Sequence, residues 1–209
     1  MKIHKNIISN KPQQLVVKNI SHMNNLKLIE RYRALDISIP KKMIGWMRSN
    51  HAGETGAVWI YLGAKCIFWN KQIQNMSREH YQTEKNHLIV MNHILSNKSK
   101  SKLLLLWRIL GFCLGFFSAL LGYRFFCVTI QSVESFVEQH YQEQIEFLYK
   151  NSISFDLLKV LEMCCDEEVE HQNDAKLQKG SHEDSSFEKI WSKVIGSGSN
   201  LAVNVSKFV

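Results

Sequence analysis

Two short stretches of the sequence pair a carboxylate with an imidazole at the same spacing. Glu84 and His87 stand three residues apart, and so do Glu168 and His171. On a helix, residues three apart lie about 60° from each other around the axis, so each pair can converge on a single point. Two such pairs on facing helices, joined by one glutamate from each of two other helices, form the ligand set of a carboxylate-bridged two-metal site in a four-helix bundle. This hypothesis requires two further glutamates at core positions.

Both further glutamates are present, on lines of residues at alternating spacings of three and four. Glu54 falls on the line Met47, Asn50, Ala57, Tyr61, Ala64 and Phe68, and Glu134 on the line Cys127, Ile130, Val137, Tyr141, Gln144 and Leu148. This spacing predicts that both carboxylates point into a helical core. The two Glu-x-x-His pairs also occupy such lines, so all six side chains are expected to be buried.

Burial of so much charge favours a metal centre. A single Glu-x-x-His is most often part of a solvated helix face. Four unpaired buried carboxylates, however, would carry a large desolvation cost or take up protons, whereas two ferrous ions supply four positive charges that compensate them. Carboxylate oxygen and imidazole without thiolate suit iron or manganese rather than structural zinc.

Other polar residues near these lines are expected to support the ligands. Tyr61, His140 and Tyr141 are candidates to hydrogen-bond them, and a polar core pair is the alternative for His140 and Tyr141. His51 and Glu138 lie beside the lines. We expect His51 to contact a ligand rather than bind metal, and Glu138 to contact a ligand or solvent. Two acidic residues that flank the last motif are expected to face solvent or basic groups, namely Glu167 and Glu170.

Four helices must position the ligands. They are expected at about 42–74, 77–96, 125–150 and 154–180, with Ser77 and Ser154 as N-caps of the second and fourth. Pro40 disfavours helix before it. The expected organisation is an arm over 1–41, a bundle over 42–180 and a short C-terminal amphipathic tail over 181–209 that packs on the bundle.

The composition suits one intracellular domain. The 209 residues are 45% hydrophobic with only 2 prolines, which allows one sizeable helical core. The five cysteines lack C-x-x-C spacing and are expected to be reduced thiols. The N-terminus has neither the apolar core of a signal peptide nor the arginine-rich bias of a transit peptide. A formal charge of +7 suits an anionic membrane surface or a nucleic acid and does not choose between them.

An apolar stretch from Leu103 to Gly122 separates the two halves of the ligand set. A single crossing of the bilayer would place the halves on opposite sides, and two crossings would need about forty apolar residues, which are absent. The stretch is therefore expected to be a crossover helix, either buried in the protein or lying in the membrane interface. The interface is favoured because the stretch has no clear polar face, and the preceding lysines can meet anionic headgroups.

Four motifs follow one another along the chain. They are RSNHAGETGA from Arg48 to Ala57, Glu84-Lys-Asn-His87, Val133-Glu134 followed by His140-Tyr141, and Asp166-Glu-Glu168-Val-Glu-His171. In this order they resemble the demethoxyubiquinone hydroxylase family over roughly residues 42–180, and H-A-G-E-x-G-A is the most specific element. The resemblance implies six metal ligands, which match the set described above: Glu54, Glu84, His87, Glu134, Glu168 and His171.

The resemblance also implies a fold and an activity. The expected fold is an all-α, ferritin-like four-helix bundle with a di-iron centre and a membrane-associated crossover helix over 103–122. The expected activity uses two iron ions per subunit and dioxygen to hydroxylate a polyprenylated methoxy-benzoquinol in ubiquinone biosynthesis, and it leaves the electron donor open. The expected partners are a membrane surface and the quinol, without nucleic acid, in a ubiquinone-biosynthesis complex or a homo-oligomer. The expected location is peripheral, on the cytoplasmic side of the cell (inner) membrane.

Three other functions use a similar bundle. A tRNA-modifying di-iron hydroxylase would need a basic groove where this chain has its apolar crossover. A non-catalytic iron-binding, ferritin-like protein has no use for an exposed membrane segment. A membrane di-iron quinol oxidase shares the ligand set, but the H-A-G-E-x-G-A element favours the hydroxylase.

Overall fold

The computed structural model describes residues 37–209, and every regular element in that range is helical. The principal helices are α2 (Ile44–Ala64), α3 (Lys71–Ile94), α4 (Leu104–Leu120), α5 (Tyr123–Asn151), α6 (Phe155–Lys179) and α7 (Ser186–Phe208), and the short 3-10 helices η1 (Lys41–Met43) and η2 (Asn97–Ser99) precede α2 and α4. The expected all-α class is confirmed. The arm expected over 1–41 falls mainly on residues outside the described range.

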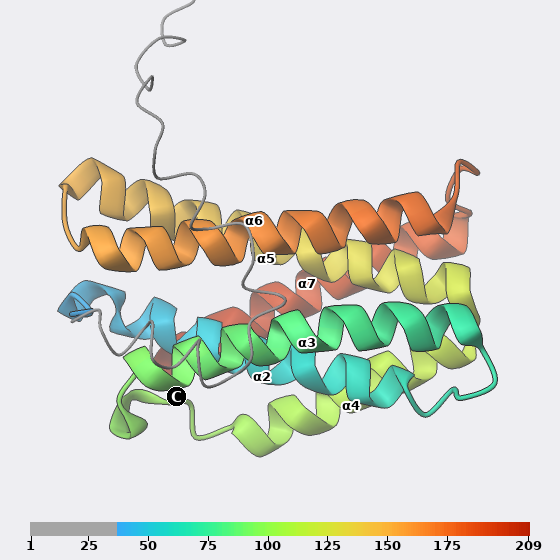
Figure 1. Ribbon diagram of the computed structural model, residues 1–209, viewed down its shortest axis with the longest axis horizontal. Coiled ribbons are helices and arrows are strands. Elements are labelled where there is room, and N and C mark those ends of the chain that lie inside the picture. The colour runs from blue at the N-terminus through green and yellow to red at the C-terminus, as the bar shows by residue number, and fades with distance from the viewer. Residues whose placement is uncertain (1–36) are drawn as a thin grey trace, which may run out of the picture.

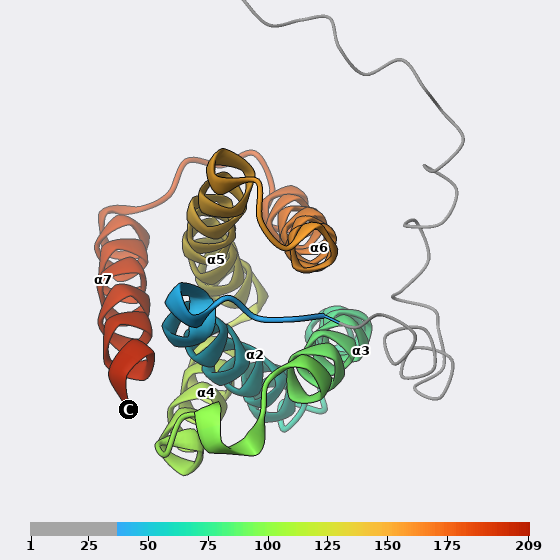
Figure 2. The same cartoon turned by 90° about the vertical axis from the view of Figure 1, so that its left-hand side faces the viewer.

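Two helical hairpins, α2 with α3 and α5 with α6, lie side by side around one interior (Figure 1). Seen end-on, α7 lies against α2 and α5, and α4 covers the outer side of α2 (Figure 2). One cluster of buried apolar residues includes Met47 and Leu161, and a second includes Ile60 and Ala175. Because Glu54 and Glu168 lie between these positions in the sequence of their helices, apolar packing closes the interior on both sides of the ligands.

The turn between the first two helices lies earlier than predicted. The sequence suggested one helix over 42–74 and a turn at 75–77, but α3 already begins at Lys71. The reason is Asn70, whose side-chain oxygen accepts hydrogen bonds from the backbone N–H groups two and three residues ahead, at 3.0 and 3.1 Å. Such a cap starts a helix efficiently. Ser77, the predicted cap, is buried inside α3.

The break between α5 and α6 falls within 151–154, as predicted. Ser152 and Ser154 adopt left-handed backbone conformations, with φ of 51° and 52°. The predicted capping role of the Ser154 side chain is wrong, because its hydroxyl donates to the carbonyl oxygen of Ser38 at 2.8 Å instead. The helix ends before Gly180, as expected; its φ of 86° favours glycine.

α7 is one continuous helix that covers nearly the whole of the C-terminal tail. It begins with a capping box, in which Ser185 and Glu188 each bond the other's backbone N–H group. The Arg124 guanidinium donates to the Glu188 carboxylate at 2.8 Å and so ties the start of α7 to the start of α5.

Arg48, near the start of α2, joins two segments that are distant in sequence. Its Nε donates to the carbonyl oxygen of Ser99 at 2.7 Å, and its Nη1 donates to that of Lys207 at 3.0 Å. The segment before α4 and the end of α7 are therefore held together at this end of the bundle.

The crossover helix α4 packs on α2 through glycines. A Cβ added to Gly111 would lie 2.3 Å from the carbonyl oxygen of Gly56, and one added to Gly115 would lie 1.8 Å from that of Ile60. The two faces of this helix differ in residue size rather than in polarity, which is why the sequence shows no polar face. Apart from Trp107, the buried residues are small, whereas many of the large apolar ones are exposed. Within residues 37–209, no helix is both long enough and apolar enough to cross a membrane.

Replacing Gly115 with alanine should separate α4 from α2. The added methyl group would collide with a backbone carbonyl, and overpacking of this kind costs about 1–3 kcal/mol. Gly196→Ala is the matched control, since its Cβ meets nothing within 4 Å and alanine stabilises a helix by up to about 1 kcal/mol over glycine. Thermal unfolding should therefore shift in opposite directions, and an unchanged midpoint for Gly115→Ala would contradict the close packing.

Candidate metal centre

The six expected ligands meet in the interior of the bundle. α2 contributes Glu54, α3 contributes Glu84 and His87, α5 contributes Glu134, and α6 contributes Glu168 and His171, all of them buried. They form two groups, Glu54–Glu84–His87–Glu168 and Glu84–Glu134–Glu168–His171, each with its ligand atoms within 4.8 Å of one another. Two carboxylates, Glu84 and Glu168, belong to both groups. This overlap is what two ions bridged by shared carboxylates require.

Both histidines turn the same nitrogen toward the carboxylates. Nδ1 of His87 lies 3.0 Å from Glu168 Oε1 and 3.5 Å from Glu54 Oε2. Nδ1 of His171 lies 3.0 Å from Glu84 Oε1. Each imidazole thus offers one nitrogen to the centre. The carboxylate and imidazole of each Glu-x-x-His pair converge, as their spacing of three residues predicted.

Several ligand atoms have no hydrogen-bond partner among the described residues. These buried atoms are both oxygens of Glu84, Oε2 of Glu168 and Nδ1 of His171. Such polar atoms are costly to leave unpaired in a protein interior. Cations between the carboxylates would satisfy them, and oxygen and imidazole donors without thiolate suit iron or manganese. The residues present therefore fit a two-metal group.

The acid–base properties of the centre point the same way. Burial raises the pKa of the Glu84 and Glu134 carboxyls well above the usual value, and neighbouring carboxylates add to this effect. Burial also acts to raise the pKa of Glu168, but the adjacent imidazoles of His171 and His87 outweigh it and hold that pKa far below the usual range. The protein alone must therefore neutralise part of this charge with protons, which metal ions can replace.

Glu167 lies beside the centre and faces a basic group, the imidazole of His87, which is one of the two surroundings predicted for it. Its Oε2 lies 2.6 Å from Nε2 of His87, the nitrogen that points away from the carboxylate cluster. A carboxylate in this position fixes the tautomer and orientation of a ligand imidazole. Glu170, predicted to face solvent, is exposed.

Two tyrosines donate hydrogen bonds to Glu54 and Glu134, the two carboxylates that belong to only one ligand group each. The Tyr141 hydroxyl donates to Glu54, and the Tyr61 hydroxyl lies 3.2 Å from Glu134 Oε1. Both therefore contact the ligands, as the sequence analysis expected. His140 instead bonds the Ser49 hydroxyl at 3.0 Å, and burial lowers its pKa to about 4.

His51 and Glu138 form hydrogen bonds with other polar side chains. His51 bonds the Asn92 side chain at 3.0 Å, and Glu138 accepts from Gln142 and Gln172. Neither residue has a hydrogen bond to a ligand among the described residues. Their positions beside the core lines, noted from the sequence, explain this.

Two polar residues near the centre were missed. The sequence analysis assigned no role to His80, whose ring stacks on that of His171, with centroids 4.2 Å apart. Its Nε2 bonds Asp174 at 2.9 Å, and burial lowers its pKa to about 4, so the ring is neutral near pH 7. The line through Glu168 and His171 continues at Ala175, so periodicity gave no signal for Asp174.

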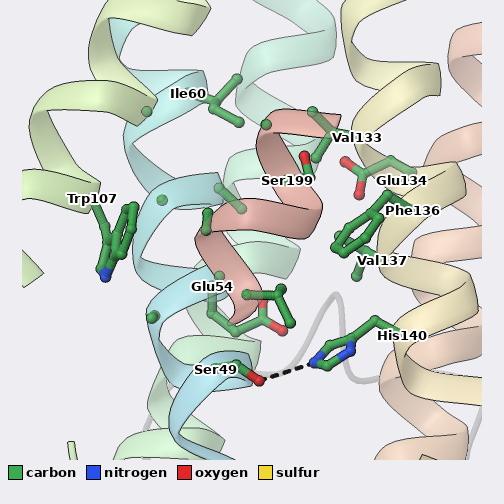
Figure 3. Close-up of a pocket in the computed structure, with 18 of the residues that line it drawn as sticks. Ser49, Glu54, Ile60, Trp107, Val133, Glu134, Phe136, Val137, His140 and Ser199 are labelled. Carbon is green, nitrogen blue, oxygen red and sulfur yellow. Dashed lines mark hydrogen bonds between the residues drawn. The ribbon is translucent and has the colours of Figure 1, made fainter. Parts of the chain in front are cut away.

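A cavity of about 350 Å³ between α2, α4, α5 and α7 reaches the carboxylates. Glu54 and Glu134 border it, and its other walls are mainly apolar (Figure 3); they include Ile60, Trp107, Val133, Phe136 and Val137. Small residues on α7, including Ser199, leave this space open. Leu110 and Val194 line the cavity and are also about half exposed, so they mark its opening to the surface. We call this cavity the apolar pocket.

The bundle and its two overlapping ligand groups define a helical protein suited to hold two metal ions between shared carboxylates. The family model described as "Ubiquinone biosynthesis protein COQ7" matches residues 41–206. The chain belongs to this family.

Individual relatives support this membership. The chain is 32% identical over 131 residues to the "NADPH-dependent 3-demethoxyubiquinone 3-hydroxylase, mitochondrial" of Rattus norvegicus. The aligned region covers 61% of this chain and 60% of the relative. It is 30% identical over 165 residues to the Bos taurus protein of the same name, which covers 77% and 75%. It is 28% identical over 167 residues to the "3-demethoxyubiquinol 3-hydroxylase" of Rhodospirillum rubrum, which covers 78% and 77%.

Proposed function

We propose that this protein is a di-iron monooxygenase that hydroxylates the ring of demethoxyubiquinol, a polyprenylated methoxy-benzoquinol, in ubiquinone biosynthesis. The observation that carries the proposal is an apolar pocket that ends at two overlapping groups of buried carboxylates and imidazoles. An apolar ring can lie in such a pocket, and metal ions can lie at its inner end. The names of the rat and bacterial relatives support the choice of substrate.

Each ligand has a role in this proposal. Glu84 and Glu168, which belong to both ligand groups, would hold both ions; Glu54 and His87 would complete one set, and Glu134 and His171 the other. When bound, two irons supply the activation of dioxygen, which side chains alone do not provide. The protein holds the ligands in register, and the apolar walls exclude water and orient the ring.

The reaction converts one ring C–H bond to C–OH with one oxygen atom of dioxygen. The other oxygen atom leaves as water, which requires two electrons and two protons. The names of the mammalian relatives include "NADPH-dependent", so NADPH is the reductant to test first. The prenyl tail is placed toward the opening near Leu110 and Val194, because the carboxylates occupy the other end.

The exposed face of α4 is suited to a membrane surface. It presents Leu105, Leu106, Ile109, Leu110, Phe117, Leu120 and Leu121 to solvent. Apolar surface of this extent usually marks an interaction site, and basic residues precede the helix at Lys98, Lys100 and Lys102. We propose a peripheral location on the cytoplasmic side of the inner membrane, with the pocket opening beside the lipid. Assembly into a ubiquinone-biosynthesis complex or a homo-oligomer stays a prediction.

Polar substitutions on this face should release the protein from membranes. We expect serine at Leu105, Ile109, Phe117 and Leu121 to lower the fraction that floats with anionic liposomes at least about tenfold, since each side chain contributes roughly 1.5–3 kcal/mol when buried. Serine at the exposed residues Tyr149, Phe155 and Leu177, on α5 and α6, is the control. Iron content should persist in both variants. Loss of iron in the α4 variant would show that this face belongs to the bundle core.

The hydroxylase proposal is tested with purified protein loaded anaerobically with ferrous iron. It is given a short-tailed demethoxyubiquinol, NADPH and ¹⁸O₂, and the product is analysed by mass spectrometry. We expect one labelled oxygen in the product and two irons per chain. Oxidation of the quinol without oxygen insertion would instead identify a quinol oxidase. Iron-loaded protein without any turnover would favour an iron-binding role.

A further inference from the structure

A row of hydrogen-bonded side chains runs from the surface to one ligand of the centre. The Asp174 side chain is 35% exposed, and its Oδ2 lies 2.9 Å from Nε2 of His80. Nδ1 of His80 lies 3.1 Å from the Tyr61 hydroxyl, which in turn lies 3.2 Å from Glu134 Oε1. His80, Tyr61 and Glu134 are all buried, so water does not compete for these bonds.

The hydrogen atoms in this row can be assigned from donor and acceptor chemistry. The carboxylate of Asp174 accepts the hydrogen on Nε2 of His80, and in this tautomer Nδ1 of His80 is left as an acceptor for the Tyr61 hydroxyl. The Tyr61 hydroxyl has one hydrogen but two acceptors within reach, Nδ1 of His80 and the carboxylate of Glu134. It can donate to only one of them at a time.

We propose that His80, held in this tautomer by Asp174, is a positioning residue that takes over the Tyr61 hydroxyl hydrogen when Glu134 binds metal. The inference rests on the ligand role of Glu134 in the proposed function. The hydroxyl hydrogen turns about the C–O bond from Glu134 to His80, and no covalent bond forms or breaks.

The exchange removes a cost from metal binding. A carboxylate that binds a cation has less electron density to offer a hydroxyl, and a buried hydroxyl without an acceptor is destabilising. Because His80 offers an equivalent acceptor at a similar distance, the Tyr61 hydroxyl keeps one full hydrogen bond whether or not Glu134 is ligated.

Glu54, the other carboxylate that belongs to only one ligand group, lacks this arrangement. The Tyr141 hydroxyl donates to Glu54, and across residues 37–209 it has no second hydrogen-bond acceptor. Glu54 and Glu134 belong to different ligand groups. The two ions should therefore respond differently to loss of His80: the step that involves Glu134 and His171 should weaken, and the other should not.

The test is an anaerobic titration with Co²⁺, followed by its visible absorption, on the folded full chain. His80→Phe keeps a ring beside His171 but removes both nitrogens, and we expect it to weaken one of the two binding steps about tenfold. His93→Phe, an exposed histidine on the same helix, is the matched control and should bind both ions as the unaltered protein does. Adding Tyr61→Phe to His80→Phe should restore binding to within a factor of about two, because no hydroxyl then needs an acceptor.

Substitutions of Asp174 provide an independent test, because changes at this partly exposed position should not prevent folding. Asp174→Asn keeps an acceptor oxygen for Nε2–H and should bind both ions normally. Asp174→Leu no longer holds the hydrogen of His80 on Nε2, so it should weaken the same metal-binding step as His80→Phe. Equal binding by the unaltered protein and His80→Phe, or no restoration by Tyr61→Phe, would overturn the proposal. Absence of any Co²⁺ binding by the unaltered protein would instead overturn the metal centre itself.

Discussion

Alanine in place of Glu168 is expected to remove both metal ions and all hydroxylation while the bundle stays folded. Glu168 belongs to both ligand groups and contacts both histidines, at 3.0 Å from His87 and 3.6 Å from His171. A helix of fixed register offers no other carboxylate at this place. Metal analysis should fall from two ions per chain to a trace, and product formation to the detection limit, with an unchanged helical circular dichroism spectrum.

Glu170→Ala is the matched control for this prediction. The two residues lie on the same helix two positions apart, but Glu170 is exposed and belongs to neither ligand group. Its replacement should leave metal content and activity unchanged. The opposite pattern, with Glu170 essential and Glu168 dispensable, would mean that the register of α6 is wrong by two residues.

Tryptophan in place of Ser199 is expected to abolish turnover without loss of metal. Ser199 lines the apolar pocket near Glu134, so an indole ring there would fill space that the substrate ring needs (Figure 3). Misplacement of a substrate by about 1 Å can already cost about a hundredfold in rate, and we expect at least that loss in kcat/KM. The measurement combines steady-state kinetics with metal analysis on the same sample.

Ser197→Trp supplies the control for the pocket. It makes the same change on the same helix, but Ser197 is exposed and lines a separate polar cavity between α5 and α7. Hydroxylation by this variant should match that of the unaltered protein. If Ser199→Trp retained full activity with two irons bound, the ring could not occupy the apolar pocket.

The ligand set was accessible from the sequence because helical periodicity is a local property. Glu54 and Glu134 stand at spacings of three and four within apolar lines, and the structure brings both into the interior with the two Glu-x-x-His pairs. The same rule misled at Phe68, which continues the line through Glu54 but is 78% exposed. There the Asn70 cap begins a new helix, and a local hydrogen bond overrides the apolar pattern.

Two supporting contacts were not accessible, because each joins segments that are distant in sequence and neither partner pair had been matched. Glu167 reaches His87 across 80 positions of sequence, and His80 meets Asp174 across 94. No local pattern signals such pairs. The buried face of α4 was missed for a different reason. Gly111 and Gly115 have no apolar side chain that would mark a buried face, and only their backbone contact with α2 shows that they form it.

The two bonds of Arg48 fix the walls of the pocket at one end. This side chain joins the segment before α4 to the end of α7, and both helices line the pocket. At the other end, Arg124 joins the start of α7 to the start of α5, which follows α4 after two residues. Walls fixed at both ends bow apart most easily between those ends, so a bulky tail should enter midway, beside Leu110 and Val194, rather than at either end.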